Sequence, residues 1–146
     1  MKIGIIGTGT LGPSIAQVFS QCEDVETVYL CKSRESSRKD GKSDIEKSYK
    51  KLVEKGKYTR EQVEIFLGKI ITGFKSIMVD ADLVIEAVAE DLEIKKNIFK
   101  EIDNICKAEC VFATNTSSLP IKAIGEGLSR PLAGMHFFNP APVMKL

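Results

Sequence analysis

The sequence predicts an α/β fold in which a mostly parallel sheet is covered by helices on both faces. Short apolar runs alternate with longer segments of helical periodicity, which is the pattern of strands joined by crossover helices. The clearest buried strands are 2–6 and 82–87, because apolar residues dominate each of these short runs. With 146 residues the chain has the length of one domain, which we place at 1–146.

The remaining elements follow from apolar spacing and capping residues. We expect helices at 11–19, 33–57, 59–68, 91–106 and 119–124, and further strands at 25–31, 70–73, 111–113 and 132–138. Residues 33–57 are charged throughout, with Ile45 and Tyr49 at helical spacing, so this helix is expected to be long and largely exposed. Thr59 followed by Gln62 is a capping-box pattern, which marks the start of the next helix.

Composition argues against several classes of function. Lysine and arginine number 21 and aspartate and glutamate 20, so the formal net charge is +1 and no nucleic acid or anionic membrane is expected as a partner. No apolar window is long enough to span a membrane, and the N-terminus does not read as a signal peptide. The 4 cysteines form no CxxC pair and only 1 histidine accompanies them, so no metal site is expected. We therefore expect a cytoplasmic protein with reduced thiols.

A glycine-rich motif directly follows the first predicted strand. The loop GTGTLG at 7–12 has the spacing GxGxxG between a strand and a helix. In a dinucleotide-binding fold the first glycine makes the tight turn, the second admits a pyrophosphate, and the third lets helix and strand pack closely. Free amides at the helix N-terminus face the phosphates. We therefore expect a Rossmann-type sheet whose cofactor-binding loop consists of Gly7, Thr8, Gly9, Thr10, Leu11 and Gly12.

Three further segments carry a resemblance to a known family. They are NTSSL at 115–119, GMHFFNPAPVMKL at 134–146, and LVIEA at 83–87 with Glu90 and Lys95. With GTGTLG they resemble, in order and along essentially the whole chain, the 3-hydroxyacyl-CoA dehydrogenases, and the bacterial 3-hydroxybutyryl-CoA dehydrogenases most closely. The resemblance implies an NAD(P)-dependent oxidoreductase that interconverts 3-hydroxyacyl-CoA and 3-oxoacyl-CoA. Another dehydrogenase of this fold class, such as a 6-phosphogluconate-type enzyme, would lack NTSS and HFFNP.

The resemblance also implies roles for particular residues. His136 is the expected general base, and imidazole suits that role because its unperturbed pKa is about 6.5. Ser117 is expected to hydrogen-bond the substrate oxygen. The cofactor contacts implied are Asn115, Glu90 and Lys95, and the CoA contacts implied are Ser48 and Lys55.

Simpler interpretations of these residues remain open. Ser117 would serve equally well as the cap of the helix 119–124. Glu90 would be a favourable charge near a helix N-terminus. Ser48 and Lys55 belong to a charged run that would be a solvated helix face.

The second predicted strand ends without the acid that NAD-binding members of this fold carry. That acid binds the ribose 2′-hydroxyl, and the alignment of both flanks puts Lys32 in its place, followed by Ser33 and Arg34. A basic stretch suits a 2′-phosphate, so we expect a preference for NADP(H) over NAD(H). The alternative is that Glu35 or a backbone group holds the ribose.

Leu146 falls inside the most recognisable segment of the family. Family members continue with a helical C-terminal domain, which supplies the dimer surface of these homo-oligomers and a carboxylate that orients the catalytic histidine. No aspartate or glutamate follows Glu126 here, so we expect His136 to lack tautomer control and charge stabilisation. The 146 residues alone are thus expected to bind cofactor and turn over poorly. The alternative is a non-catalytic nucleotide-binding fragment or remnant.

Overall fold

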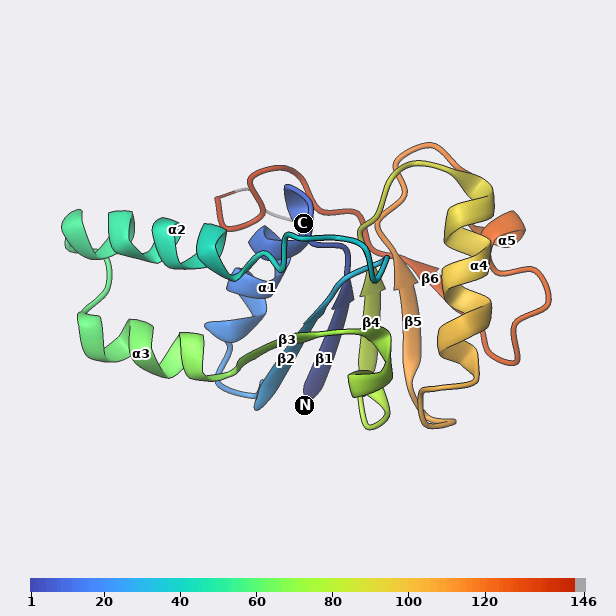
Figure 1. Ribbon diagram of the computed structural model, residues 1–146, viewed down its shortest axis with the longest axis horizontal. Helices are drawn as coiled ribbons and strands as arrows, with labels where there is room; N and C mark the ends of the chain where they lie inside the picture. Colours follow the sequence, from blue (N-terminus) through green and yellow to red (C-terminus); the bar gives the residue numbers. More distant parts are fainter. Residues whose placement is uncertain (144–146) are drawn as a thin grey trace.

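The computed structural model describes residues 1–143, which contain a six-stranded sheet (Figure 1). The strands lie in the order β3-β2-β1-β4-β5-β6, and every neighbouring pair is parallel. Their bounds are Lys2–Ile6 (β1), Thr27–Cys31 (β2), Ile70–Gly73 (β3), Leu83–Glu86 (β4), Val111–Thr114 (β5) and Leu132–Gly134 (β6). This is the strand order of the doubly wound dinucleotide-binding sheet, so the expected fold class is confirmed.

Helices cover both faces of the sheet. They are α1 (Leu11–Ser20), α2 (Lys42–Glu54), α3 (Arg60–Gly68), α4 (Leu92–Asp103), α5 (Ile121–Ile124) and the 3-10 helix η1 (Lys75–Met78). Successive strand residues point to opposite faces, so Ile5 packs toward α1 and Ile6 toward α4. None of the helices in residues 1–143 is long and apolar enough to cross a membrane.

The helix expected at 33–57 is wrong in its first third. Residues 32–41 form turns and irregular loop, and α2 starts only at Lys42. Gly41 causes the break, because its φ of +82° is a left-handed conformation and a Cβ there would meet Pro13 at 2.7 Å. The loop 32–41 therefore follows the end of β2, where it borders the site described below.

The strand expected at 132–138 is also wrong in its second half. Its ladder with β5 ends where the Met135 amide donates to the Thr114 carbonyl oxygen. Two residues later the Phe137 amide donates to the Asn115 side-chain oxygen and not to a carbonyl of a neighbouring strand. The short helix likewise begins later than expected, at Ile121, with Pro120 as its N-cap.

The helices α2 and α3 form a pair that extends sideways from the sheet (Figure 1). The capping box at Thr59 and Gln62 is confirmed and starts α3. Tyr49, Tyr58 and Phe66 pack their rings against one another, with centroids 5.4–6.4 Å apart. The Tyr49 hydroxyl also lies 2.7 Å from Ser20 Oγ on α1. The pair is therefore anchored to α1, and the facing surfaces of α1 and α2 border a groove.

Candidate active site

The carboxyl ends of all six strands meet at one edge of the sheet, because every strand pair is parallel. Gly7 follows β1, Lys32 follows β2, and Asn115 follows β5, while His136 lies two residues beyond β6. Ligands of doubly wound folds bind outside this edge, at the point where the strand order reverses. Here that point lies between β1 and β4.

The glycine loop has the geometry that a pyrophosphate needs. Gly7 has a φ of +120°, and a Cβ there would collide with the Ala87 carbonyl. A Cβ on Gly12 would collide with the Gly7 carbonyl, so this position needs glycine for helix and strand to pack. Gly9 has no such restraint: its φ is not positive and a Cβ would meet nothing within 4 Å. The free space at Gly9 therefore fits a group that approaches the backbone from outside.

The start of α1 adds hydrogen-bond donors to this loop. Its N-cap is Thr10, whose side chain makes no capping hydrogen bond. The first amides of an α-helix have no partner within the helix, and they carry the positive end of its dipole. A phosphate at the glycine loop would meet these amides.

A cleft of about 460 Å³ opens at the glycine loop. Besides the loop, the sides are formed by the segment after β2, the segment after β4 and the start of α4. The lining residues are Gly7, Thr8, Gly9, Ser33, Arg34, Ser36, Ser37, Lys39, Ala87, Val88, Ala89 and Ile94. The Thr8 hydroxyl donates to the Lys39 carbonyl oxygen at 2.7 Å and thereby ties the two sides together. We call this space the glycine-loop cleft.

Lys32 does not line the glycine-loop cleft. Its Nζ lies 5.8 Å from the centre of the Phe74 ring, and it borders a separate hollow together with Glu35. Arg34 and Ser33 line the cleft itself. The Lys32 side chain, which the sequence placed at the ribose, is thus turned away, and the cations that line the cleft are Arg34 and Lys39.

Lys95 is an interior residue. Its side chain is 2% exposed and its Nζ lies 2.6 Å from Glu86 Oε1, on a side chain that is 0% exposed. Glu86 also accepts hydrogen bonds from the Val88 amide at 2.7 Å and the Thr114 hydroxyl at 2.6 Å. The buried pair thus fixes the segment after β4, which forms one side of the cleft. Sequence reasoning assigned Glu86 no role, although a carboxylate in an otherwise apolar strand calls for a buried partner.

Glu90 holds the loop that follows β5. Its carboxylate accepts hydrogen bonds from the Thr116 hydroxyl at 2.6 Å and from the Ser117 amide and hydroxyl, both at 3.0 Å. Burial alone would raise the pKa of Glu90, but these hydrogen bonds and the Lys95 ammonium outweigh it, and the pKa lies below its usual value. The carboxylate is therefore ionised at neutral pH and fixes Ser117.

The capping interpretation of Ser117 is not observed. Helix α5 has Pro120 as its N-cap and no side chain caps it. The hydroxyl that bonds the Leu119 amide belongs to Thr116, at 3.0 Å. Glu90 directly precedes Asp91, the N-cap of α4, whose side chain accepts the Ile94 amide at 2.9 Å, so the interpretation of Glu90 as a charge near the helix N-terminus stays open.

His136 is exposed and held by Asn115. Its Nδ1 lies 3.1 Å from the Asn115 carbonyl oxygen, and the Asn115 side chain accepts the Phe137 amide at 2.6 Å. A carbonyl oxygen only accepts, so Nδ1 carries the proton and the neutral ring has its lone pair on Nε2. The expected lack of tautomer control is therefore wrong, because a backbone carbonyl provides it. No carboxylate within residues 1–143 hydrogen-bonds this imidazole.

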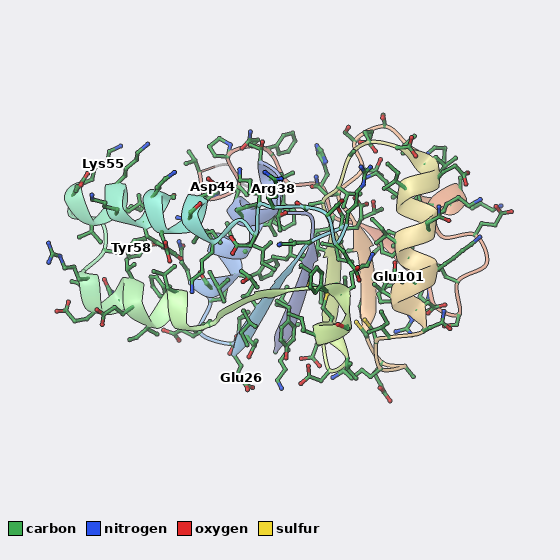
Figure 2. All side chains as sticks on the ribbon, viewed as in Figure 1. Glu26, Arg38, Asp44, Lys55, Tyr58 and Glu101 are labelled. Atoms are coloured by element: carbon green, nitrogen blue, oxygen red, sulfur yellow. The ribbon has the colours of Figure 1, made fainter. Side chains whose placement is uncertain are left out.

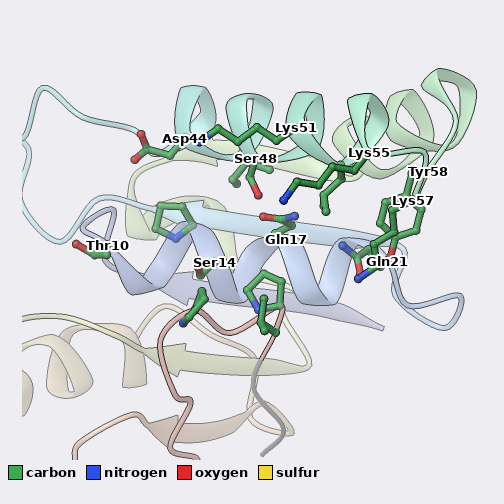
Figure 3. Close-up of a pocket in the computed structure, with 16 residues that line it drawn as sticks. Thr10, Ser14, Gln17, Gln21, Asp44, Ser48, Lys51, Lys55, Lys57 and Tyr58 are labelled. Carbon is green, nitrogen blue, oxygen red and sulfur yellow. Dashed lines mark hydrogen bonds between the residues drawn. The ribbon is translucent and has the colours of Figure 1, made fainter.

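A second opening lies between α1 and α2. It has a volume of about 320 Å³, and Ser48 and Lys55 line it together with Lys51 and Lys57 (Figure 3). Pro140, Pro142 and Val143 close its other wall, so the segment that follows His136 borders it too. We call it the α1–α2 groove. Figure 2 shows Lys55 and Tyr58 toward the outer end of the α2–α3 pair, away from the sheet.

The fold and this edge define a dinucleotide-binding Rossmann protein with a positioned histidine. Residues 2–146 match the NAD binding domain of the 3-hydroxyacyl-CoA dehydrogenase family, and the chain belongs to this family. It is an NAD(H)-binding domain of oxidoreductases, as the resemblance implied. Met144, Lys145 and Leu146, which end the HFFNPAPVMKL segment, lie outside the described residues.

Known relatives are similar in sequence, and a solved structure is similar in fold. The chain is 42% identical to 3-hydroxybutyryl-CoA dehydrogenase from Clostridioides difficile, across 100% of this chain and 52% of the relative. It is 39% identical to human mitochondrial hydroxyacyl-coenzyme A dehydrogenase, across 99% of this chain and 48% of that protein. The crystal structure of (S)-3-hydroxybutyryl-CoA dehydrogenase from Ralstonia eutropha superimposes with a TM-score of 0.87 at 33% identity, covering 99% of this chain and 52% of that one. The chain thus spans about half the length of these relatives.

Proposed function

We propose that this chain is the cofactor-binding part of an oxidoreductase that interconverts 3-hydroxyacyl-CoA and 3-oxoacyl-CoA, with 3-hydroxybutyryl-CoA and acetoacetyl-CoA as the substrate pair. The observation that carries the proposal is the Asn115 carbonyl, which holds Nδ1 of His136 and so puts the lone pair of the neutral ring on Nε2. This histidine stands at the same sheet edge as the glycine loop. A base and a dinucleotide site at one edge are the two parts that oxidation of an alcohol needs.

In the proposed reaction, His136 Nε2 takes the proton of the 3-hydroxyl while the hydrogen on C3 leaves with its electron pair. A bound nicotinamide supplies the acceptor for that hydride. The Ser117 hydroxyl donates to Glu90 in the free protein, so it would hydrogen-bond the substrate oxygen by turning its proton from Glu90 toward that oxygen. In the reverse direction the His136 imidazolium returns the proton to the oxygen.

We further propose that the chain by itself turns over slowly. Forming the imidazolium is easier when a carboxylate faces the other ring nitrogen, and here Nδ1 faces a neutral carbonyl. The alternative of a non-catalytic nucleotide binder predicts no turnover at all. A single-turnover reaction separates the two, because an excess of protein makes slow chemistry visible.

We propose NADP(H) as the preferred cofactor. Arg34 and Ser33 line the glycine-loop cleft and suit a 2′-phosphate, whereas Glu35 lines a different hollow and leaves the cleft without that carboxylate. Arg34→Gln should therefore remove most of the preference. Lys32→Gln is the matched control and should retain it, because Lys32 is turned toward Phe74. If the parent chain binds NADH at least as tightly as NADPH, this cofactor assignment fails.

The cofactor site is tested most sharply at Gly9. Valine there points into open space, so the variant should fold with the stability of the parent, within about 0.5 kcal/mol. It should nevertheless lose at least about tenfold in affinity for NADPH, because the side chain occupies the space of the pyrophosphate. Gly68→Val is the control: its Cβ also meets nothing within 4 Å, but it lies on α3. Equal NADPH affinity of Gly9→Val and the parent would refute the site.

A further inference from the structure

A buried amide at the α1–α2 groove has no partner inside the described protein. Gln17 lies on α1 and is 2% exposed. Among residues 1–143, no polar atom hydrogen-bonds its Nε2. Buried polar groups are nearly always paired, because an unpaired one costs roughly 1–3 kcal/mol. A donor kept unpaired beside an opening therefore indicates an acceptor that comes from outside.

Gln17 lies where a bound molecule would cross the groove. Figure 3 shows its amide between α1 and the side chains of Ser48 and Lys55, which reach down from α2. Gln21, the C-cap residue of α1, also lines the groove, but both ends of its amide are used. Its Nε2 donates to the Tyr49 hydroxyl at 3.3 Å and its Oε1 accepts from the Tyr58 hydroxyl at 3.1 Å. Only the first of these two amides is thus free for a ligand.

The two walls of the groove differ in their chemistry. Lys51, Lys55 and Lys57 line it from α2 and the turn after α2, and they suit phosphate groups. Pro140 lines the opposite wall and follows His136 by only four residues in the sequence. A molecule that joins these regions needs phosphates at one end, a reactive group at the other and an uncharged middle.

The pantetheine arm of an acyl-CoA has this middle section. It is an extended, uncharged chain with two amide groups, and each amide carbonyl is a hydrogen-bond acceptor. Ile45 and Leu52 also line the groove and suit the methylene groups of the arm. A nicotinamide dinucleotide has no comparable uncharged linker between its phosphates and its reactive ring.

We propose that Gln17 Nε2 donates a hydrogen bond to an amide carbonyl of the pantetheine arm, which makes Gln17 a substrate-binding residue in addition to Ser48 and Lys55. The inference rests on the proposed function, because that function supplies the acyl-CoA. It assigns the unpaired donor a partner that is present only in the complex.

Gln17→Met tests the proposal because methionine has nearly the same length and no amide. Calorimetric titration of the 146-residue chain with CoA should give an affinity about fivefold weaker than that of the parent. The free variant should at the same time melt roughly 2–4 °C higher, because a buried unpaired amide is gone. A residue with a merely structural role would lower the melting temperature and the affinity together.

Gln21→Met is the matched control, at the C-cap of the same helix and in the same groove. It removes the hydrogen bonds to Tyr49 and Tyr58, so its melting temperature should fall. Fragments of CoA locate the contact: Gln17→Met should weaken 4′-phosphopantetheine as much as CoA and leave adenosine 3′,5′-bisphosphate unchanged.

The outcomes separate the inference from the proposed function. If Gln17→Met binds CoA as tightly as the parent, or melts at a lower temperature, the inference is overturned and the proposed function stands. Equal weakening of adenosine 3′,5′-bisphosphate also overturns it, because the contact would then not be with the arm. If the parent binds neither CoA nor 4′-phosphopantetheine, the acyl-CoA assignment itself fails.

Discussion

Replacing Lys95 by methionine should strongly destabilise the protein. The change removes the ammonium that lies 2.6 Å from Glu86, and both side chains are almost completely buried, at 2% and 0% exposure. The carboxylate that is left behind retains the Val88 amide and the Thr114 hydroxyl as donors but loses its opposite charge. Within residues 1–143, no lysine or arginine other than Lys95 forms an ion pair with Glu86.

The magnitude follows from the burial of the pair. Removing one partner of a buried ion pair costs about 3–5 kcal/mol, because the remaining charge is left uncompensated in the interior. For a domain of this size that corresponds to a fall in melting temperature of roughly 6–20 °C. Since native domains are stable by only about 5–15 kcal/mol, Lys95→Met should retain little of its stability.

Urea unfolding followed by circular dichroism measures the effect, with Lys96→Met as the control. Lys96 is the next residue on α4 and pairs with Glu126 at 3.1 Å, but that carboxylate is 75% exposed. Its removal should therefore change stability by less than about 1 kcal/mol. The double variant Glu86→Gln/Lys95→Met should recover much of the loss, because no charge is left in the interior. A Lys95→Met variant as stable as Lys96→Met would refute this account of the site.

Three further predictions concern the loop, the pH dependence and the thiols. Glu90→Ala should lower stability by about 1–2 kcal/mol in urea unfolding, because the hydrogen bonds from Thr116 and Ser117 are lost; no loss would contradict the role of Glu90. Burial alone would raise the pKa of Asp103, but hydrogen bonds from Ser129 and Arg130 hold that pKa below its usual value. This carboxylate thus contributes stability above the unfolded pKa of about 3.9 that is lost as pH falls through the lower folded pKa. The melting temperature should therefore fall less steeply with pH below pH 4 in Asp103→Asn than in the parent. An equally steep fall in both proteins would contradict this role of Asp103. A thiol reagent at pH 8 should label Cys22 at once and the other cysteines only on unfolding, because the other three are buried and burial raises the pKa of Cys31 to about 12. Rapid labelling of folded Cys22→Ser would contradict this prediction.

The fold was largely predictable because it depends on local patterns. Each of the six strands lies in a short apolar run of the sequence, and GTGTLG marks the join between β1 and α1. The failures occurred where a distant contact decides the local structure. Gly41 breaks the expected helix because it packs against Pro13, and Asn115 takes the amide that would have extended β6. Neither contact is visible in the hydrophobic periodicity.

The site was predictable as a set of residues but not as an arrangement. Family resemblance proposed His136, Ser117 and Glu90 as site residues, and it could not show that Glu90 binds the Ser117 loop. The burial of Lys95 had a sequence signal, because Lys95 shares the apolar stripe of α4 with Phe99 and Ile102. The orientations of Lys32 and Arg34 had no sequence signal, because they depend on how the chain leaves β2 and on where Phe74 lies.

A single-turnover reaction tests the central claim most directly. An excess of the 146-residue chain is mixed with NADPH and acetoacetyl-CoA, and the loss of reduced-nicotinamide absorbance is followed. The account predicts slow consumption that is faster with NADPH than with NADH and disappears in His136→Gln. Consumption at the same rate in His136→Gln, or none in the parent, would contradict the claim that this histidine and this cleft carry out the reaction.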